Sequence, residues 1–451
     1  MNDGHSPIEG GHRKMVVECV RRALRAKPAL PSFPADDEDL LKSGALDSMG
    51  WLAVLQSLQE KAGVDGILDC PEIGEPCSIA ALVAVLEKGA VLEKGAVLER
   101  GAAPRKQESP QTDEFALSQP APVAAAPTAV VEIAGWGAAL GCLRITAEKL
   151  DGEYNLAEGT LRERAGIESV ARAGEAENEL SLATQAAETA LRAADIGIAE
   201  IDWLIATSET FVGFPSFGSL LHTRLLARGT CGVLDVGGAC VGLLNALSVG
   251  NSLLAAGTAN RVLITTAEVH SRRLTPQCVA GEFGGLFGDG ASAFVMTRGD
   301  SAGKAGRYRV RDFQFGCAGS VSSALAVGMR ANGQVALEFR GEALARAALV
   351  RLEKIIAALE LRTGFDRRTA SSFATHQPNP RIIEMLARQA NLPLEKFPVV
   401  SRVFGNLGSS TCGVALSLAL SQHAGKPAPE RGPIFLAGVG PGMLWGGGVL
   451  C

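Results

Sequence analysis

Residues 231–250 read CGVLDVGGACVGLLNALSVG, an apolar run followed by small residues, a cysteine and a long helical stretch. The approach Gly237-Gly238-Ala239 permits a sharp strand-to-helix turn, which places Cys240 at the N-terminus of a helix. Unpaired N–H groups and the helix dipole at that end stabilise a thiolate, so we expect a lowered pKa for this thiol. A thiolate is the natural nucleophile for taking an acyl group from a thioester. The alternative is a small buried cysteine in a core helix.

Two later segments carry polar residues of the kind that assist such a nucleophile. His376 ends an apolar run in SSFATHQPNPRII (371–383), before a turn with prolines and a helix. Catalytic residues are often found at such strand ends. Asn406 lies in a glycine-rich turn of SRVFGNLGSSTCGVALSLAL (401–420), where it could also simply adopt a left-handed turn conformation.

Around these segments, short apolar runs alternate with long Ala- and Leu-rich helical stretches. The runs are VVEIAGWG (130–137), IDWLIAT (201–207), RVLITTAE (261–268) and PIFLAGVG (433–440). This alternation predicts an α/β domain over residues 130–451.

Composition limits the function classes. The 451 residues are 47% apolar and 20% charged, as in a soluble globular protein of two or three folding units. A net charge of −5 gives no overall positive potential that would attract the phosphate backbone of a nucleic acid. Ten cysteines without a paired framework predict free thiols in a reducing cytoplasm. Residues 236–260 are uncharged, but asparagines and glycines interrupt them, so we expect a core helix and no membrane span.

The N-terminal part has a different character. Residues 101–129 are rich in Pro and Ala and predict a flexible linker, and a tandem hexapeptide (AVLEKG, AVLEKG, AVLERG) occupies 84–101. Helix-like spacing in 16–25 and 49–63 predicts a small helical bundle, after a disordered tail at 1–12. Residues 36–75 carry ten acidic residues against two lysines.

Ser48 follows Asp47 at the start of the predicted amphipathic helix. It could be an ordinary N-cap, or an exposed hydroxyl to which a prosthetic group is attached. Residues 13–88 resemble an acyl or peptidyl carrier domain, whose Asp-Ser-Leu signature reads Asp47-Ser48-Met49 here. The resemblance implies a small four-helix bundle. It also implies that a phosphopantetheinyl transferase attaches 4′-phosphopantetheine to Ser48. The acidic surface fits docking on basic partners.

Residues 131–451 resemble β-ketoacyl-acyl-carrier-protein synthase III, of the thiolase superfamily. The resemblance rests on the three segments above and on ETFVGFPS (209–216), FGDGASAF (287–294), RERAGIES (162–169) and GVGPGMLWGG (438–447). It implies an αβαβα layered fold with two similar halves, about 130–300 and 308–451. It also implies a homodimer formed through this domain.

The same resemblance implies roles for individual residues. Cys240 would accept the acyl group, while His376 and Asn406 would bind the thioester carbonyl of the extender and stabilise its enolate. Arg164 and Arg381 match arginines near the entrance, and Phe214 matches an aromatic residue that closes the acyl pocket of the partner subunit.

Two positions depart from the family pattern. Thr160 replaces a tryptophan that stacks on the adenine of coenzyme A, which favours a carrier-bound donor over coenzyme A. Gly440-Pro441-Gly442 stands where three glycines are common, and proline has no N–H to donate to an oxyanion. This loop resembles that of type III polyketide synthases.

The sequence therefore predicts decarboxylative Claisen condensation of an acyl group on Cys240 with a malonyl-type, carrier-bound extender. The setting would be bacterial fatty-acid or polyketide metabolism. Acyl transfer to an alcohol or amine without loss of CO2 is the main alternative, and a catalytically idle scaffold is a further one. We expect no metal and no nucleotide cofactor, because Cys70 and Cys77 lack further ligands and GWGAALG (135–141) lacks the dinucleotide-binding spacing.

Overall fold

The computed structural model describes residues 9–24, 33–62 except 42, 44 and 47, 77–87, and 130–451 except 280, 300–305, 318–324, 330–334, 340 and 427–429. The chain divides into two compact units, Met1–Ala116 with Arg340–Val350, and Leu117–Phe339 with Arg351–Cys451. Residues 89–129, which hold the predicted linker and the part of the repeat after residue 88, lie outside the described residues, as do Asp47 and residues 1–8 of the predicted tail.

The first unit contains the helices α1 (Glu9–Leu24) and α2 (Ser48–Ala62) and a helical stretch at residues 79–87. Their apolar faces form a core that includes Val16, Val20, Trp51, Leu55 and Leu82, all buried. α1 begins before the expected start of the bundle at residue 13. The described residues are helical as expected, whereas a four-helix bundle stays a prediction.

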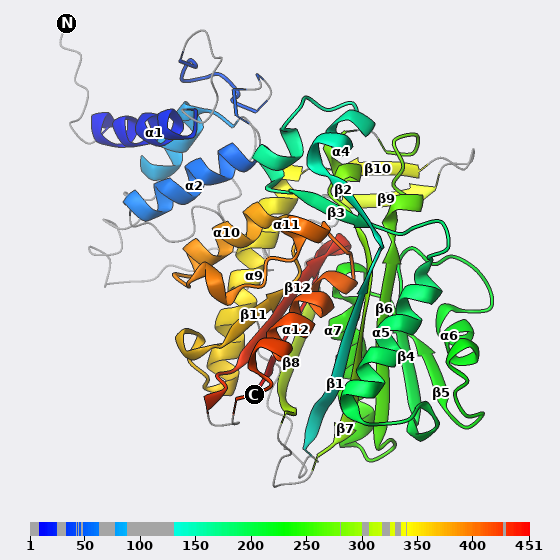
Figure 1. Ribbon diagram of the computed structural model, residues 1–451. Coiled ribbons are helices and arrows are strands. Elements are labelled where there is room, and N and C mark those ends of the chain that lie inside the picture. Colours follow the sequence, from blue (N-terminus) through cyan, green and yellow to red (C-terminus); the bar gives the residue numbers. More distant parts are fainter. Residues whose placement is uncertain are drawn as a thin grey trace, which may run out of the picture. The chain divides into compact units, whose positions relative to one another are not determined.

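The second unit is built on a nine-stranded sheet with the order β11-β12-β13-β8-β1-β7-β6-β4-β5 (Figure 1). Its strands are β1 (Val131–Leu140), β4 (Trp203–Thr207), β5 (Gly232–Asp235), β6 (Arg261–Val269), β7 (Asp289–Arg298), β8 (Tyr308–Cys317), β11 (Ser372–Thr375), β12 (Ile434–Gly440) and β13 (Leu444–Leu450).

The strand order repeats between the two halves of this unit. In the first half, β1 pairs antiparallel with β7, β7 antiparallel with β6, and β6 parallel with β4. In the second half, β8 pairs antiparallel with β13, β13 antiparallel with β12, and β12 parallel with β11. The halves meet where β1 pairs with β8 at Glu132↔Arg309 and Ile133↔Tyr308. The predicted two similar halves are confirmed.

Two helices lie between the half-sheets, and others cover their outer faces (Figure 1). The inner helices α7 (Gly242–Ala255) and α12 (Ser410–His423) each contact strands of both halves. α5 (Glu179–Ala194) and α6 (Phe217–Leu225) cover the first half, and Ile355 and Leu359 of α9 (Gly341–Thr363) pack on β13. The αβαβα layering of the thiolase-like fold is thereby confirmed.

Small residues allow the inner helix α12 to approach the sheet. A Cβ atom at Gly413 would lie 2.0 Å from Ser292 Oγ on β7, so only glycine fits there. The predicted core helix within 236–260 is α7, where Leu243, Leu244 and Leu247 are buried. No helix among the described residues is long and apolar enough to cross a membrane.

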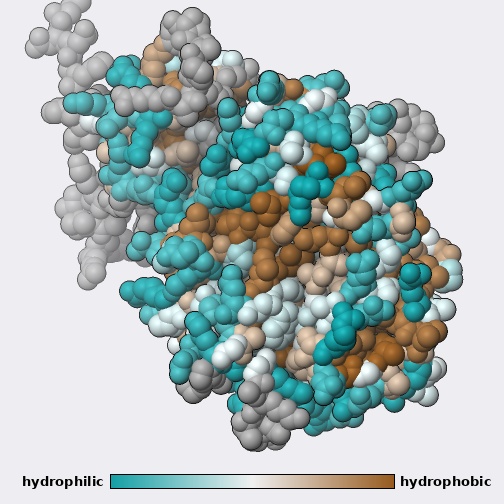
Figure 2. All heavy atoms as spheres, in the orientation of Figure 1, coloured by the Kyte–Doolittle hydropathy of each residue, from teal (hydrophilic) through white to brown (hydrophobic). Residues whose placement is uncertain are grey.

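The remaining elements are shorter or peripheral. They are β2 (Leu143–Thr146), α4 (Ala147–Glu153), β3 (Ser169–Arg172), α8 (Glu282–Gly285), β9 (Leu325–Met329), β10 (Val335–Phe339), α10 (Pro380–Gln389) and α11 (Ser401–Phe404). Polar side chains predominate on the face shown in Figure 2, and apolar side chains gather in a band across its middle.

Candidate active site

Cys240 lies in a tight turn between β5 and α7. The turn passes through Gly238 and Ala239, whose φ angles are +136° and +49°, into the short helix η4 (Ala239–Val241). The Asn245 side chain donates a hydrogen bond to the Gly237 carbonyl at 3.0 Å and fixes the turn. The predicted strand-turn-helix around Cys240 is confirmed, and the side chain is 9% exposed.

The predicted lowering of the thiol pKa is wrong. Burial raises the pKa of Cys240 well above its ordinary value, and the charges of Glu209 and Glu268 raise it further. A hydrogen bond from the residue's own backbone N–H acts in the opposite direction but is weaker. The resting side chain is therefore a thiol, and it needs a proton acceptor when it reacts.

His376 follows β11 directly, at the predicted strand end. Its backbone N–H donates to the Ala437 carbonyl on β12 at 2.8 Å, and its side chain is buried. Burial lowers the pKa of His376 to about 3, with a further contribution from His270. The imidazole is neutral at physiological pH, and its Nδ1 has no hydrogen-bond partner within the described part of the chain.

Asn406 lies in the turn between α11 and α12. The left-handed conformation belongs to the preceding Gly405, with a φ of +79°, and not to Asn406, so the turn-only alternative is wrong. The Asn406 Oδ1 atom accepts hydrogen bonds from the Gly408 N–H at 3.0 Å and the Thr411 hydroxyl at 3.1 Å. These bonds fix the amide plane and leave its NH2 group to donate elsewhere.

The segments that carry these three residues converge at the end of β12. A Cβ atom at Gly440 would lie 3.3 Å from the Cys240 backbone nitrogen, and one at Gly438 would lie 3.6 Å from His376 Cβ. The Gly408 backbone, which bonds to the Asn406 amide, also makes a polar contact with the His376 ring. Residues from four distant sequence segments thus meet at one place.

Two carboxylates that the sequence analysis overlooked belong to the same site. Glu268, at the end of β6, accepts the backbone N–H of Glu209 at 3.0 and 3.1 Å, that of Thr210 at 3.0 Å, and the Ser409 hydroxyl. Burial raises the pKa of Glu209 to about 7, and burial together with Glu209 raises that of Glu268. Both charges act on Cys240.

One signal in the sequence could have pointed to Glu209. It follows the apolar run 201–207, and Cys240 follows the apolar run within 231–250. Residues that follow parallel strands meet at the carboxyl edge of a sheet, where ligands bind in α/β folds. The sequence does not disclose that these two strands are neighbours.

The predicted entrance arginines lie on adjacent segments. Arg381, on α10, pairs with Glu384 at 2.9 Å and donates to the Glu163 carbonyl at 3.1 Å, next to Arg164. Arg164, on the short helix η2 (Leu161–Ala165), lies 3.5 Å from Glu282. Thr160 precedes η2, and its hydroxyl donates to the Ala157 carbonyl at 2.6 Å.

Phe214 is not part of this cluster, and Ser48 belongs to a different unit of the chain. Phe214 is 101% exposed on the loop between β4 and α6. Ser48 is the first residue of α2 in the other unit. Pro441 starts the short helix η10 (Pro441–Met443), directly after the Gly440 that packs on Cys240.

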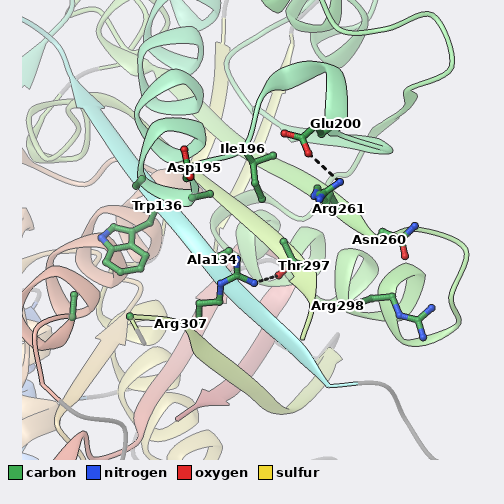
Figure 3. Close-up of a pocket in the computed structure, with 14 residues that line it drawn as sticks. Ala134, Trp136, Asp195, Ile196, Glu200, Asn260, Arg261, Thr297, Arg298 and Arg307 are labelled. Carbon is green, nitrogen blue, oxygen red and sulfur yellow. Dashed lines mark hydrogen bonds and ion pairs between the residues drawn. The ribbon is translucent and has the colours of Figure 1, made fainter. Parts of the chain in front are cut away.

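A separate recess of about 910 Å³ is lined by other residues (Figure 3). Its lining includes Arg261, Arg298 and Arg307; Arg261 pairs with Glu200 at 3.3 Å, and Arg307 donates to Thr297 at 3.1 Å. Arg261 starts β6, whereas Glu268 is near the end of that strand. The recess is therefore at the opposite end of the sheet from Cys240.

Comparisons with known proteins agree with the fold. Residues 234–321 match the family described as 3-oxoacyl-[acyl-carrier-protein (ACP)] synthase III, and residues 362–451 match its C-terminal part. The chain is 32% identical over 310 residues to the β-ketoacyl-[acyl-carrier-protein] synthase III of Ruegeria pomeroyi, covering 64% of this chain and 89% of that protein.

Solved structures of this kind are also similar. The 3-oxoacyl-[acyl-carrier-protein] synthase III of Aquifex aeolicus superposes with a TM-score of 0.63 at 28% identity, over 71% of this chain and 99% of that one. A priming β-ketosynthase from a polyketide biosynthetic pathway does so with a TM-score of 0.63 at 25% identity, over 72% and 96%. The chain belongs to the β-ketoacyl-acyl-carrier-protein synthase III family of acyltransferase-type condensing enzymes.

Proposed function

We propose that this chain forms a β-ketoacyl thioester. Cys240 takes an acyl group from a carrier or coenzyme A thioester, and the acyl group then condenses with a malonyl-type extender that loses CO2. The observation that carries this proposal is that the segments carrying Cys240, His376 and Asn406 converge at the end of β12, with a neutral His376 and an Asn406 amide fixed by hydrogen bonds. Neutral donors suit an oxygen that becomes negative during the reaction.

The proposed reaction has two steps, in which different residues act. In the first, Cys240 Sγ bonds to the acyl carbon, the carbon–sulfur bond of the donor breaks, and the thiol proton ends on the departing sulfur. In the second, the extender loses CO2, and negative charge moves to its thioester oxygen. The Asn406 amide is held by Gly408 and Thr411, so its NH2 group meets that oxygen without reorganisation. The resulting carbanion attacks the acyl carbon and releases Cys240.

Ser48 is the proposed attachment site of 4′-phosphopantetheine, added by a phosphopantetheinyl transferase. Support comes from its place at the first position of α2 and from the acidic sequence around it. The attached arm supplies a thiol that holds an acyl or malonyl group as a thioester. Attachment to the same chain makes the encounter with Cys240 intramolecular, with effective concentrations of order millimolar.

A second candidate acceptor is an alcohol or amine, with no loss of CO2. Pro441 favours it, because the loop that packs on Cys240 lacks an N–H at this position. Condensation remains the leading proposal. Two hydrogen bonds orient the Asn406 amide, and simple acyl transfer would gain little from that orientation.

We also propose a homodimer through the thiolase-like domain. Phe214 and Val212 are 101% and 77% exposed, and β5 forms the edge of the sheet beside them. Large apolar side chains this exposed favour burial by a second subunit.

One experiment separates the two acceptors. The carrier is loaded with malonate, an acyl thioester donor is added, and CO2 release and intact mass are followed. Condensation predicts CO2 and a β-ketoacyl group on the carrier. Acyl-Cys240 without CO2 would reject condensation and favour transfer. Cys240→Ala should abolish both outcomes, whereas Ser48→Ala should remove only the route through the carrier of the same chain.

A further inference from the structure

Glu209 and Cys240 leave the sheet at the same edge. β4 and β5 are parallel neighbours, with Ala206 paired to Asp235 near their carboxyl ends. Glu209 follows β4, and Cys240 follows β5. The charge of Glu209 acts on the Cys240 thiol more strongly than the charge of Glu268 does. A carboxylate therefore lies within electrostatic range of the predicted nucleophile.

Hydrogen bonds fix the backbone that carries Glu209. Its N–H donates to both oxygens of the Glu268 carboxylate. The next residue, Thr210, donates its N–H to Glu268 and accepts the Val269 N–H on its hydroxyl at 2.8 Å. The Phe211 N–H donates to the Ser208 hydroxyl at 3.1 Å. The segment is held rigidly, although it lies in a loop.

The Glu209 carboxylate itself is free to interact with other groups. Within the described residues it accepts no hydrogen bond and forms no ion pair, and its side chain keeps solvent-exposed surface. The surrounding protein is nevertheless dense enough to raise the pKa of this carboxyl to about 7. An unpaired acid of this kind is suited to exchanging protons near neutral pH.

The neighbouring titratable groups are less suited to this task. Glu268 is occupied by two backbone N–H groups and the Ser409 hydroxyl. His376 is a weak base because burial lowers its pKa to about 3. His270 uses Nδ1 to contact the Gly288 carbonyl at 3.1 Å, and burial lowers its pKa as well.

We propose that Glu209 is a catalytic residue, the general base that takes the proton of Cys240 Sγ during acylation. As Sγ bonds to the acyl carbon of the donor, the S–H proton moves to the Glu209 carboxylate. As the donor's carbon–sulfur bond breaks, the same proton moves to the departing sulfur. Glu209 ends the step as a carboxylate, and no oxidant or reductant is needed. This inference rests on the proposed function, because it assumes that Cys240 is acylated.

The test uses two reactions of the same sulfur in the full-length chain. Acylation by octanoyl-N-acetylcysteamine is followed by intact mass between pH 5.5 and 9, and alkylation by iodoacetamide is followed on the Cys240 peptide. The variants are Glu209→Gln, Glu209→Asp and, as a matched control on the exposed face of α5, Glu188→Gln.

The two reactions should respond in opposite directions. Wild-type acylation should rise with pH through about 7, as Glu209 ionises. Glu209→Gln should lose that inflection and acylate about 100-fold more slowly, the usual size of a general-base contribution. Alkylation needs only the thiolate, and removal of the Glu209 charge lowers the Cys240 pKa, so it should be faster. Glu209→Asp should retain part of the acylation rate, and Glu188→Gln should match wild type in both reactions.

The results that would contradict the role of Glu209 can be told apart from those that would contradict the proposed function. If Glu209→Gln acylates as fast as wild type, the inference fails while the proposed function stands. If both reactions slow together and Glu209→Asp is equally slow, Glu209 has only a structural role, and the inference fails as well. If wild-type Cys240 is not acylated at all, the proposed function itself fails and the inference with it.

Discussion

The Glu268 carboxylate binds the backbone N–H of Glu209 through both of its oxygens, at 3.1 and 3.0 Å. This bond connects the end of β6 to the loop after β4, and Ser409, directly before α12, donates to the same carboxylate. One buried side chain thus holds together segments from both halves of the domain. The site around Cys240 depends on it.

Replacing Glu268 by Ala should destabilise the protein. The change leaves the N–H groups of Glu209 and Thr210 and the Ser409 hydroxyl without an acceptor, which costs about 1–3 kcal/mol for each buried group that stays unpaired. We expect a clearly lower thermal unfolding midpoint. Glu175→Ala, at an exposed turn, is the control and should leave the midpoint unchanged. An unchanged midpoint in Glu268→Ala would show that this network is not structural.

The stability effect of Glu209 should depend on pH. Its pKa is about 7 in the folded chain and 4.5 as its ordinary value, so the folded state keeps a proton that the unfolded chain releases. The stability contributed by the protonated group is fully present below pH 4.5 and is lost as the pH rises through about 7. Glu209→Gln cannot ionise. It should match wild type at pH 4.5 and unfold at a higher temperature at pH 8.5. If the unfolding temperatures of Glu209→Gln and wild type differ by the same amount at both pH values, the pKa of Glu209 is not raised.

Gly440→Ala should slow acylation of Cys240 with little change in folding. The added Cβ would lie 3.3 Å from the Cys240 nitrogen and 3.4 Å from its Cβ, so the nucleophile must shift by a few tenths of an ångström. Gly152→Ala is the control, because nothing lies within 4 Å of its new methyl group. The rates are measured by intact mass. If Gly440→Ala is acylated at the wild-type rate, the loop does not constrain Cys240.

His376→Ala and Asn406→Ala should separate the two half-reactions. Each removes one neutral donor from the proposed enolate, and loss of such a donor costs about 100- to 1,000-fold in rate. CO2 release should therefore fall by this amount, while acyl-Cys240 still forms. Comparable loss of both half-reactions would mean that these residues serve acylation and not the enolate.

The local chemistry of the site could be predicted from the sequence, and its electrostatics could not. The glycines before Cys240 predict the turn, because backbone freedom is a local property. The sign of the thiol pKa shift depends on burial and on Glu209 and Glu268, which come from other strands. Only the neighbouring positions of β4, β5 and β6 bring these groups together, and strand order is non-local.

The fold, too, could be predicted only in part from the sequence. Alternating apolar runs predict an α/β domain, and the family resemblance implies two similar halves; the strand order agrees with both. The joining of the half-sheets through Glu132 and Ile133 depends on pairing between distant strands, which periodicity does not encode. For the N-terminal unit, helices with a buried core around Trp51 agree with the amphipathic pattern.

The proposed role of Cys240 is tested by locating the acyl group. Wild type and Cys240→Ala are incubated with an acyl thioester, digested and mapped by mass spectrometry. We predict an acyl adduct confined to the peptide that contains Cys240 in wild type, and no adduct in Cys240→Ala. An adduct on another cysteine, or one that persists in Cys240→Ala, would contradict the role of Cys240 as the acylated nucleophile.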